Sequence, residues 1–407
     1  MDLLTTQPND HLGIIFGFLD TWDLLKGMRV SKRYSRFSAK QWPIAANNAN
    51  TVWECKYTAV KNTYGDVLDS LIDTYCVPGI SNIEFNDHFA ISNKQISNVA
   101  KKCGKFLTSL TIDHAHKINF EGLSVIAKIT SLTNLSLTNL AGMWEPQMSK
   151  LIALQNLTHL SLNHWYYITD QTAGELIRLP KLTHLTLAGC TKLTGVTVIK
   201  IAKLINLTHL NLSHIWRLTD ASIIELVNLP GLISLNLTRC SCVTDHSIKE
   251  LSKLANLSEL LLFGCYHITD VSILALATLR NLTKLELLGS QITDVSIIEL
   301  SKLETLQVLL LECRNMTDLS IMALSSSKSL TALHVYNNGN ITDTSVASLK
   351  QLPNLVELSL VSIYRLTRSS ICALSQSSSL KLLNVYCDFI SASDIAEIKK
   401  HSNIVFV

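Results

Sequence analysis

The stretch LTHLNLSHIWRLTDASIIELVNLPGLISLNL, residues 207–237, decides the fold of this chain. It begins and ends on the same triplet, L-x-x-L-x-L, and the two copies are spaced 25 residues apart. Leucine alternates with polar residues inside each triplet, and this period of two predicts a short strand with one buried face. Between the triplets Ile223, Leu226 and Leu229 recur at helical spacing, and Pro230 ends the expected helix.

The same unit recurs along most of the chain at steps of 25 residues, with two steps of 24 residues around Leu306. Well-formed triplets begin at Leu132, Leu157, Leu182, Leu207, Leu232, Leu257, Leu282, Leu306, Leu330, Leu355 and Leu380. Looser copies begin at Ile80 and Leu107, which gives thirteen repeats and a terminal fragment at Ile404. One unit cannot bury its own leucines, whereas stacked units can. The sequence therefore predicts an α/β solenoid over residues 80–407, with parallel strands on a concave face and helices on a convex face.

A Thr-Asp step precedes the helix in many repeats, as at Thr219-Asp220 and Thr293-Asp294. Side-chain oxygens of Thr and Asp accept hydrogen bonds from the first free N–H groups of a helix. We expect these residues to act as helix caps.

The repeats resemble the cysteine-containing class of leucine-rich repeats. The hallmark Cys lies three residues after the last strand leucine, where this chain has Cys190, Cys240 and Cys265. The resemblance covers residues 80–407. It implies a buried side chain that hydrogen-bonds loop backbone, a structural role without reactivity.

The 407-residue chain is 47% apolar, and its formal net charge of +3 gives no reason to expect a nucleic-acid or membrane partner. No run reaches the ~20 apolar residues of a membrane-spanning helix, and the N-terminus lacks the pattern of a signal peptide. The ten cysteines form no CxxC pair. We therefore expect reduced thiols and a cytoplasmic or nuclear protein.

Residues 1–45 do not share the repeat and resemble an F-box, the adaptor-binding module of cullin-based ubiquitin ligases. The resemblance rests on Pro8, Ile15, Leu19, Asp23-Leu24-Leu25 and Val30-Ser31-Lys32-Arg33, which follow one another in the family's order. It implies a small all-α bundle that contacts a Skp-type adaptor through Pro8, Leu12, Ile15, Leu19, Leu24, Leu25 and Val30. The alternative is a helical cap for the solenoid. Residues 46–79 are expected to join the two parts as a helical linker.

The layout implies that the chain is the substrate-recognition subunit of a cullin–F-box E3 ubiquitin ligase. The chain would be a monomer within that larger complex and would not itself be an enzyme. The chain has no G-x-G-x-x-G, P-loop, H-E-x-x-H or G-x-S-x-G motif, so we expect neither catalysis nor a cofactor. Two alternatives remain: a non-ligase interaction scaffold, or a microbial effector that hijacks a host ubiquitin ligase in the host cytosol.

The concave face should bind the protein substrate, because rigidly presented aromatic residues suit a binding hot spot. The candidate residues are Leu261, Phe263, Leu288, Leu310, His334, Tyr336, Val361 and Tyr386. Alternatively, neighbouring loops or a C-terminal extension cover them. The edge loops are expected to carry further aromatic residues, which either form a second aromatic rim or pack the bends: Trp165, Tyr166, Trp216, Tyr266 and Tyr364.

Three histidines, His159, His184 and His209, occupy one column of the predicted sheet. The outer two would stand about 9–10 Å apart, too far to share one zinc ion. We expect no metal site there, and interpret the column as a solvated ladder or a pH-sensitive contact surface.

Overall fold

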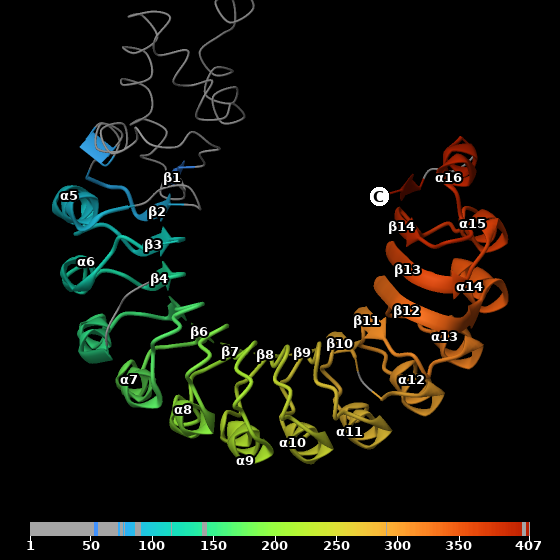
Figure 1. The fold of residues 1–407 in the computed structure, drawn as a ribbon, viewed down its shortest axis with the longest axis horizontal. Coiled ribbons are helices and arrows are strands. Elements are labelled where there is room, and N and C mark those ends of the chain that lie inside the picture. Colours follow the sequence, from blue (N-terminus) through green and yellow to red (C-terminus); the bar gives the residue numbers. More distant parts are fainter. Residues whose placement is uncertain are drawn as a thin grey trace, which may run out of the picture. The chain divides into compact units, whose positions relative to one another are not determined.

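The computed structural model describes residues 53–55, 72–73, 76, 78–85, 91–114, 116–140, 145–289, 291–400 and 404–406. The F-box-like segment 1–45, with all seven expected adaptor contacts, lies outside these residues. The chain divides into two compact units, Met1–Cys190 and Thr191–Val407. In each unit parallel strands line one side and helices the other (Figure 1). The predicted α/β repeat fold is confirmed.

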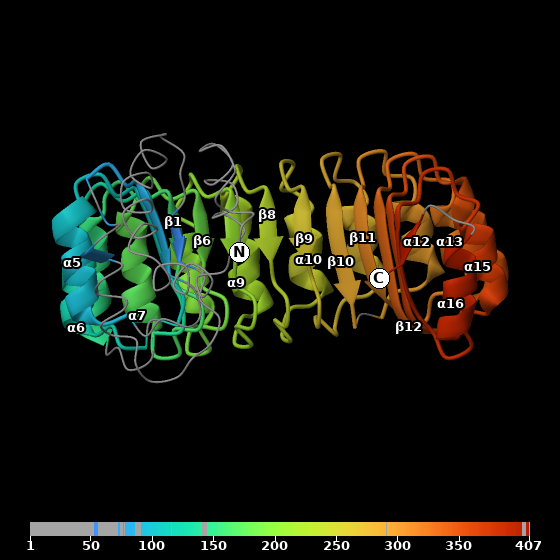
Figure 2. The same ribbon diagram turned by 90° about the horizontal axis from the view of Figure 1, so that it is seen from above.

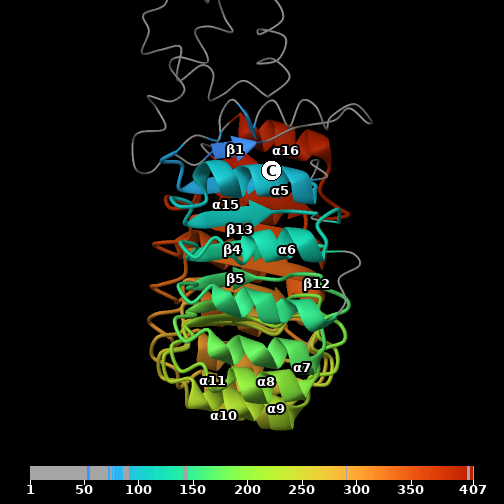
Figure 3. The same cartoon turned by 90° about the vertical axis from the view of Figure 1, so that its left-hand side faces the viewer.

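In the first unit the strands pair in parallel and in chain order, β1 to β6. Figure 3 shows α5 and α6 lying one beside the other on the helix side. The elements are β1 (Trp53–Cys55), β2 (Asn82–Phe85), α5 (Asn93–Cys103), β3 (Ser109–Ile112), α6 (Phe120–Ile126), β4 (Asn134–Leu137), the 3-10 helix η1 (Glu145–Ala153), β5 (His159–Ser161), α7 (Asp170–Ala173), the 3-10 helix η2 (Gly174–Arg178) and β6 (His184–Thr186).

Strand β1 lies inside the segment 46–79, for which we expected helices. It pairs with β2, so the sheet begins one strand before the repeat at Ile80. Residues 53–55 read Trp-Glu-Cys and carry no leucine triplet, so the repeat pattern could not reveal this strand. Ile72 and Asp73 are helical.

The second unit holds the remaining repeats, and its strands again pair in parallel and in chain order from β7 to β15. Figure 2 shows β9, β10 and β11 side by side. The helices are α8 (Gly195–Ile201), α9 (Asp220–Ile224), η3 (Glu225–Asn228), α10 (Asp245–Leu251), α11 (Asp270–Leu276), α12 (Asp294–Leu300), α13 (Asp318–Leu324), α14 (Asp343–Ser348), η4 (Leu349–Gln351), α15 (Arg368–Leu374) and α16 (Ala392–Lys399). The strands are β7 (His209–Asn211), β8 (Ser234–Asn236), β9 (Glu259–Leu261), β10 (Lys284–Leu288), β11 (Val308–Glu312), β12 (Ala332–Thr342), β13 (Glu357–Arg365), β14 (Leu382–Tyr386) and β15 (Val405–Phe406).

The triplet leucines form the core. Leu210 is 2% exposed, and Leu235 and Leu260 on the following strands are fully buried. The helical residues Ile223 and Leu226 face them from the other side and are also fully buried. Burial of a leucine side chain contributes roughly 1.5–3 kcal/mol, so the stacked columns supply the main driving force for folding.

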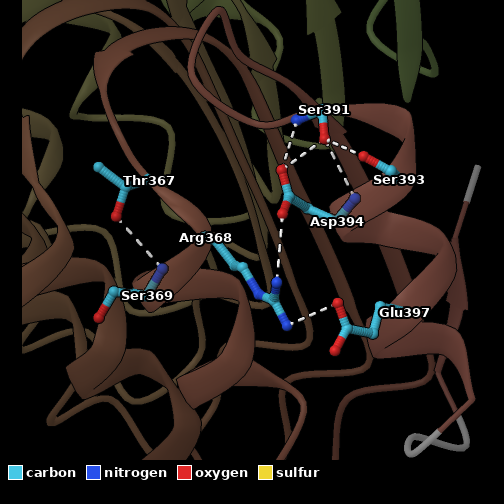
Figure 4. Close-up of polar contacts among 7 residues, drawn as sticks. All are labelled: Thr367, Arg368, Ser369, Ser391, Ser393, Asp394 and Glu397. Carbon is cyan, nitrogen blue, oxygen red and sulfur yellow. Dashed lines mark hydrogen bonds and ion pairs between the residues drawn. The ribbon is translucent and has the colours of Figure 1, made fainter.

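Ion pairs join the last helix to the repeat before it (Figure 4). The Arg368 guanidinium at the start of α15 lies 2.9 Å from Glu397 and 3.5 Å from Asp394, both on α16. Ser391 caps α16 and accepts a hydrogen bond of 3.2 Å from the Asp394 backbone N–H. The predicted terminal fragment follows this helix, and its residues 405–406 form strand β15 beside β14.

A buried thiol connects successive repeats. Cys190, Cys240 and Cys265 donate their S–H to the carbonyl oxygens of Leu162, Leu212 and Leu237 at 3.1, 3.4 and 3.3 Å. The expected hydrogen bond to backbone is therefore confirmed. Burial raises the pKa of Cys190 and of Cys265 to about 12, so both stay protonated donors. Trp165 replaces the thiol in its repeat, with its indole N–H 2.7 Å from the Leu137 carbonyl oxygen.

The Thr-Asp step has two functions, of which only the cap was expected. Thr317 caps α13 by accepting from the Leu319 N–H at 3.3 Å. Asp294, one repeat earlier, reaches forward and accepts from the Thr317 N–H at 2.8 Å and the Thr317 hydroxyl at 2.7 Å. The Ser320 hydroxyl also donates to Asp294. The aspartate therefore ties its repeat to the next one.

This inter-repeat aspartate ladder runs through the second unit. Its carboxylates each accept both the backbone N–H and the hydroxyl of the next repeat's Thr, and they belong to Asp220, Asp245, Asp270, Asp294, Asp318 and Asp343. Burial alone would raise the pKa of Asp294, but the hydrogen bonds from Ser320 and Thr317 outweigh it and lower the pKa. The ladder therefore favours the ionised carboxylate.

Replacing Cys240 with Ala should lower the free energy of unfolding by about 1–3 kcal/mol, because the Leu212 carbonyl oxygen loses a buried donor. Chemical denaturation measures the change. The control is Cys242→Ala at the exposed thiol two residues later, which should leave stability unchanged. Equal losses in the two variants would show that the Cys240 hydrogen bond contributes nothing.

Replacing Asp294 with Asn should lower the free energy of unfolding at neutral pH by roughly 1–3 kcal/mol, because charge-assisted hydrogen bonds are lost. A carboxyl whose pKa is lowered on folding stabilises the protein above its unfolded value of 3.8 and loses that effect as pH falls through the folded pKa. Denaturation at neutral pH and about pH 3 should therefore show less pH dependence in the variant. Asp388→Asn, at an exposed position, is the control. If Asp294→Asn changed stability and its pH dependence no more than this control does, the result would contradict the role of the ladder.

Candidate functional site

The outward side chains of strands β9 to β14 form a surface that we call the strand face. Its central column is set by the register of the sheet and consists of Leu261, Glu286, Leu310, His334, Ser359 and Asn384. A second column brings Tyr336, Val361 and Tyr386 together on adjacent strands. The sheet thus gathers residues that lie about 25 positions apart in the sequence into one continuous surface.

Most of the predicted substrate-binding residues lie on this face and remain accessible. Leu261, Leu310, His334, Tyr336 and Val361 are half-buried, and Tyr386 is 73% exposed. Phe263 follows β9 and is also half-buried, with the Arg239 guanidinium carbon 5.3 Å from its ring centroid. Leu288 ends β10, but its side chain lies outside what the structure describes. The alternative in which loops bury these side chains does not apply to the six described on the strands.

Four glutamates, which were not among the predicted site residues, share the strand face. Glu259, Glu286, Glu312 and Glu357 occupy outward positions of β9, β10, β11 and β13. Each of them is adjacent in the sequence to a buried strand leucine, and alternation along a strand places such neighbours on the outward face, so the signal was present. The predicted site residues were aliphatic or aromatic side chains and one histidine. The face is therefore mixed apolar and acidic, not mainly apolar.

A Ser-His-Glu cluster lies at the centre of the face. His334 pairs in register with Ser359, and its Nε2 atom is 3.7 Å from Oε1 of Glu357. That distance exceeds a hydrogen bond. Ser359 is 3% exposed, and its hydroxyl has no hydrogen-bond partner among the described residues. A nucleophilic serine needs a bond to its base and access to substrate, and this geometry provides neither.

Burial lowers the pKa of His334. Glu357 and Glu286 act in the opposite direction, and Lys284 adds to the lowering. The imidazole is therefore neutral at physiological pH. Its ring lies parallel to that of Tyr336, with centroids 6.4 Å apart.

His159 and His184 of the predicted column lie in the first unit. In the first unit the rings of His159 and His184 stack with centroids 3.9 Å apart, and their Nδ1 atoms lie 2.9 Å from the hydroxyls of Thr158 and Thr183. His209 belongs to the second unit. The described residues contain no group of three side chains that could hold a metal ion. The stacked pair fits the ladder that the sequence suggested.

The edge loops divide into packed and exposed aromatics. Trp165 is 3% exposed and packs a bend, whereas Trp216 and Tyr266 are 52% and 58% exposed. Tyr364, which was expected in a loop, lies in strand β13 and is 47% exposed. Tyr266 lies against Gly289 of the next repeat, which has a φ of +77°. A Cβ at that glycine would lie 2.7 Å from the Tyr266 ring, so glycine lets the ring lie flat. None of the described helices is long and apolar enough to cross a membrane.

Replacing Ser359 with Ala should leave the free energy of unfolding unchanged or raise it by up to about 1 kcal/mol, because the variant no longer buries an unpaired hydroxyl. Ser320→Ala is the matched control. Ser320 is fully buried but donates to Asp294, so its loss should cost about 1–2 kcal/mol. Chemical denaturation of both variants measures the difference. Equal destabilisation would mean that Ser359 has a partner.

No protein-family model matches the chain, and no curated protein matches it. Among solved structures, it is similar to a chain in the crystal structure of the Rad7 and Elc1 complex in yeast, with a TM-score of 0.62 and 18% identity over 95% of this chain and 97% of that one. An internalin, InlF from Listeria monocytogenes, is similar at a TM-score of 0.49 and 22% identity, over 78% of this chain and 82% of that one. The likeness to the yeast chain shows the fold, a leucine-rich-repeat solenoid.

Proposed function

We propose that this chain is the substrate-recognition subunit of a cullin–F-box E3 ubiquitin ligase. Residues 1–45 bind a Skp-type adaptor, and the strand face binds a protein substrate. The observation that carries the proposal is the order of Pro8, Ile15, Asp23-Leu24-Leu25 and Val30-Ser31-Lys32-Arg33 ahead of a leucine-rich-repeat fold. The solved yeast structure of the same fold is a complex of Rad7 with Elc1, which supports an adaptor-bound arrangement.

The proposed role requires no covalent chemistry from this chain. A substrate held on the strand face stays near the conjugating enzyme that the cullin recruits, so its lysines meet the activated ubiquitin at a raised local concentration. The construction of the repeats suits this task. Hydrogen bonds such as Cys265 to Leu237 and Thr317 to Asp294 join each repeat to its neighbour and hold the strands in register. A partner then meets a surface that needs little ordering on binding.

The repeats belong, in this proposal, to the cysteine-containing class of leucine-rich repeats. Cys190, Cys240 and Cys265 support the assignment, because each occupies the hallmark position and bonds the previous repeat. Other residue types also occupy this position. In this chain Trp165 and Asn338 bond backbone carbonyl oxygens through their side-chain nitrogens at 2.7 and 2.9 Å. Ile215 and Ile363 fill the same position as buried apolar side chains.

The decisive experiment is co-purification of the full chain with a Skp-type adaptor. Wild-type protein should bind one to one, and Leu19→Asp should lower the affinity at least about 30-fold, because a charge replaces an apolar contact at a binding hot spot. Pro8→Ala should weaken binding less. Ile205→Asp, at a position 66% exposed in the second unit, is the control and should bind like wild type.

Absence of binding by well-folded wild-type protein would contradict the ligase assignment. Residues 1–45 would then act as a cap of the repeats, and the protein would be an interaction scaffold.

A further inference from the structure

The strand face carries unbalanced negative charge in the second unit. Strands β9 to β13 carry four glutamates at outward positions, Glu259, Glu286, Glu312 and Glu357. The permanent cations in the same described strands are Lys284 in β10 and the exposed Arg365, which ends β13. The chain as a whole has a net charge of +3. The acidic character is therefore local to this surface and does not reflect the overall composition.

The carboxylates have few cationic partners. Lys284 lies 3.5 Å from Glu286, and His334 lies 3.7 Å from Glu357 but is neutral. Glu259 and Glu312 accept from neutral donors, the Ser234 hydroxyl at 3.0 Å and the Asn337 amide at 2.7 Å. No ion pair joins Glu259 or Glu312 to a cation within the described residues. Most of the negative charge thus remains available to a binding partner.

Apolar side chains flank these charges. Glu286 pairs in register with Leu261 on one side and Leu310 on the other, and its side chain is only 17% exposed. A charge between apolar neighbours is screened less than one in open water, so it attracts an opposite charge more strongly. Covering it with an apolar or acidic partner would be costly, because the carboxylate would lose water without gaining a counter-charge.

We propose that the strand face over β9 to β13 binds a segment of a partner protein in which lysine or arginine side chains are interspersed with apolar ones. The inference rests on the proposed function, in which this face is the substrate surface. The partner's cations pair with Glu312 and Glu357, and its apolar side chains cover Leu261, Leu310 and Val361. Nucleic acid and acidic segments are disfavoured by the same carboxylates.

The test uses two fluorescein-labelled peptides of equal length that carry lysines or glutamates at the same positions among the same leucines and alanines. Fluorescence anisotropy measures binding to the full chain. The lysine peptide should bind at least about tenfold more tightly than the glutamate peptide, and raised salt should weaken it because ions screen the attraction.

A pair of double variants distinguishes this face from diffuse charge. Glu312→Gln with Glu357→Gln should lower the affinity for the lysine peptide about tenfold. Glu250→Gln with Glu299→Gln removes the same charge from helices α10 and α12, where the glutamates pair with Lys253 and Lys302, and should leave the affinity unchanged. Equal binding of the two peptides, or equal effects of the two double variants, would overturn the proposal.

Because the peptides do not involve the adaptor, the two proposals can fail separately. Loss of adaptor binding with retained peptide selectivity would reject the ligase assignment alone. Adaptor binding without peptide selectivity would reject the basic partner alone.

Discussion

The fold depends on the inability of any repeat to bury its own leucines. A unit of about 25 residues has one strand face and one helix face to cover, too little for an independent core. Stacking solves this, because Leu210, Leu235 and Leu260 lie beside one another on successive strands and lose almost all contact with water. The parallel sheet and the strand face follow from that single requirement.

Polar contacts then fix how each repeat meets the next. Thiols, an indole and an amide reach backbone carbonyl oxygens of the preceding repeat, and the aspartate ladder reaches forward to the cap of the following helix. Both kinds of contact are directional, whereas leucine packing is not. They explain how repeats of differing sequence keep one register, as in the pairing of Leu310 with His334 and of His334 with Ser359.

Periodicity made the repeats predictable, because burial demands the same residues at the same spacing. The thiol contact was also foreseen, since its position relative to the strand is fixed. The ladder was not, because a Thr-Asp step looks like a local cap and only three-dimensional stacking brings Asp294 to Thr317. Helix ends were partly missed as well: α9 stops at Ile224 and continues as the 3-10 helix η3, a tighter turn that leads toward Pro230. The glutamates of the strand face were visible in the sequence but were not weighed.

In the proposed function, adaptor and substrate bind separate parts of one chain, the adaptor residues 1–45 and the substrate the strand face. Hydrogen–deuterium exchange of the full chain, with and without a Skp-type adaptor, tests that separation most directly. The adaptor should slow exchange within residues 1–45 and leave the exchange rate of β9 to β13 unchanged. If the adaptor slowed exchange on the strand face and did not slow it in residues 1–45, the result would contradict this assignment.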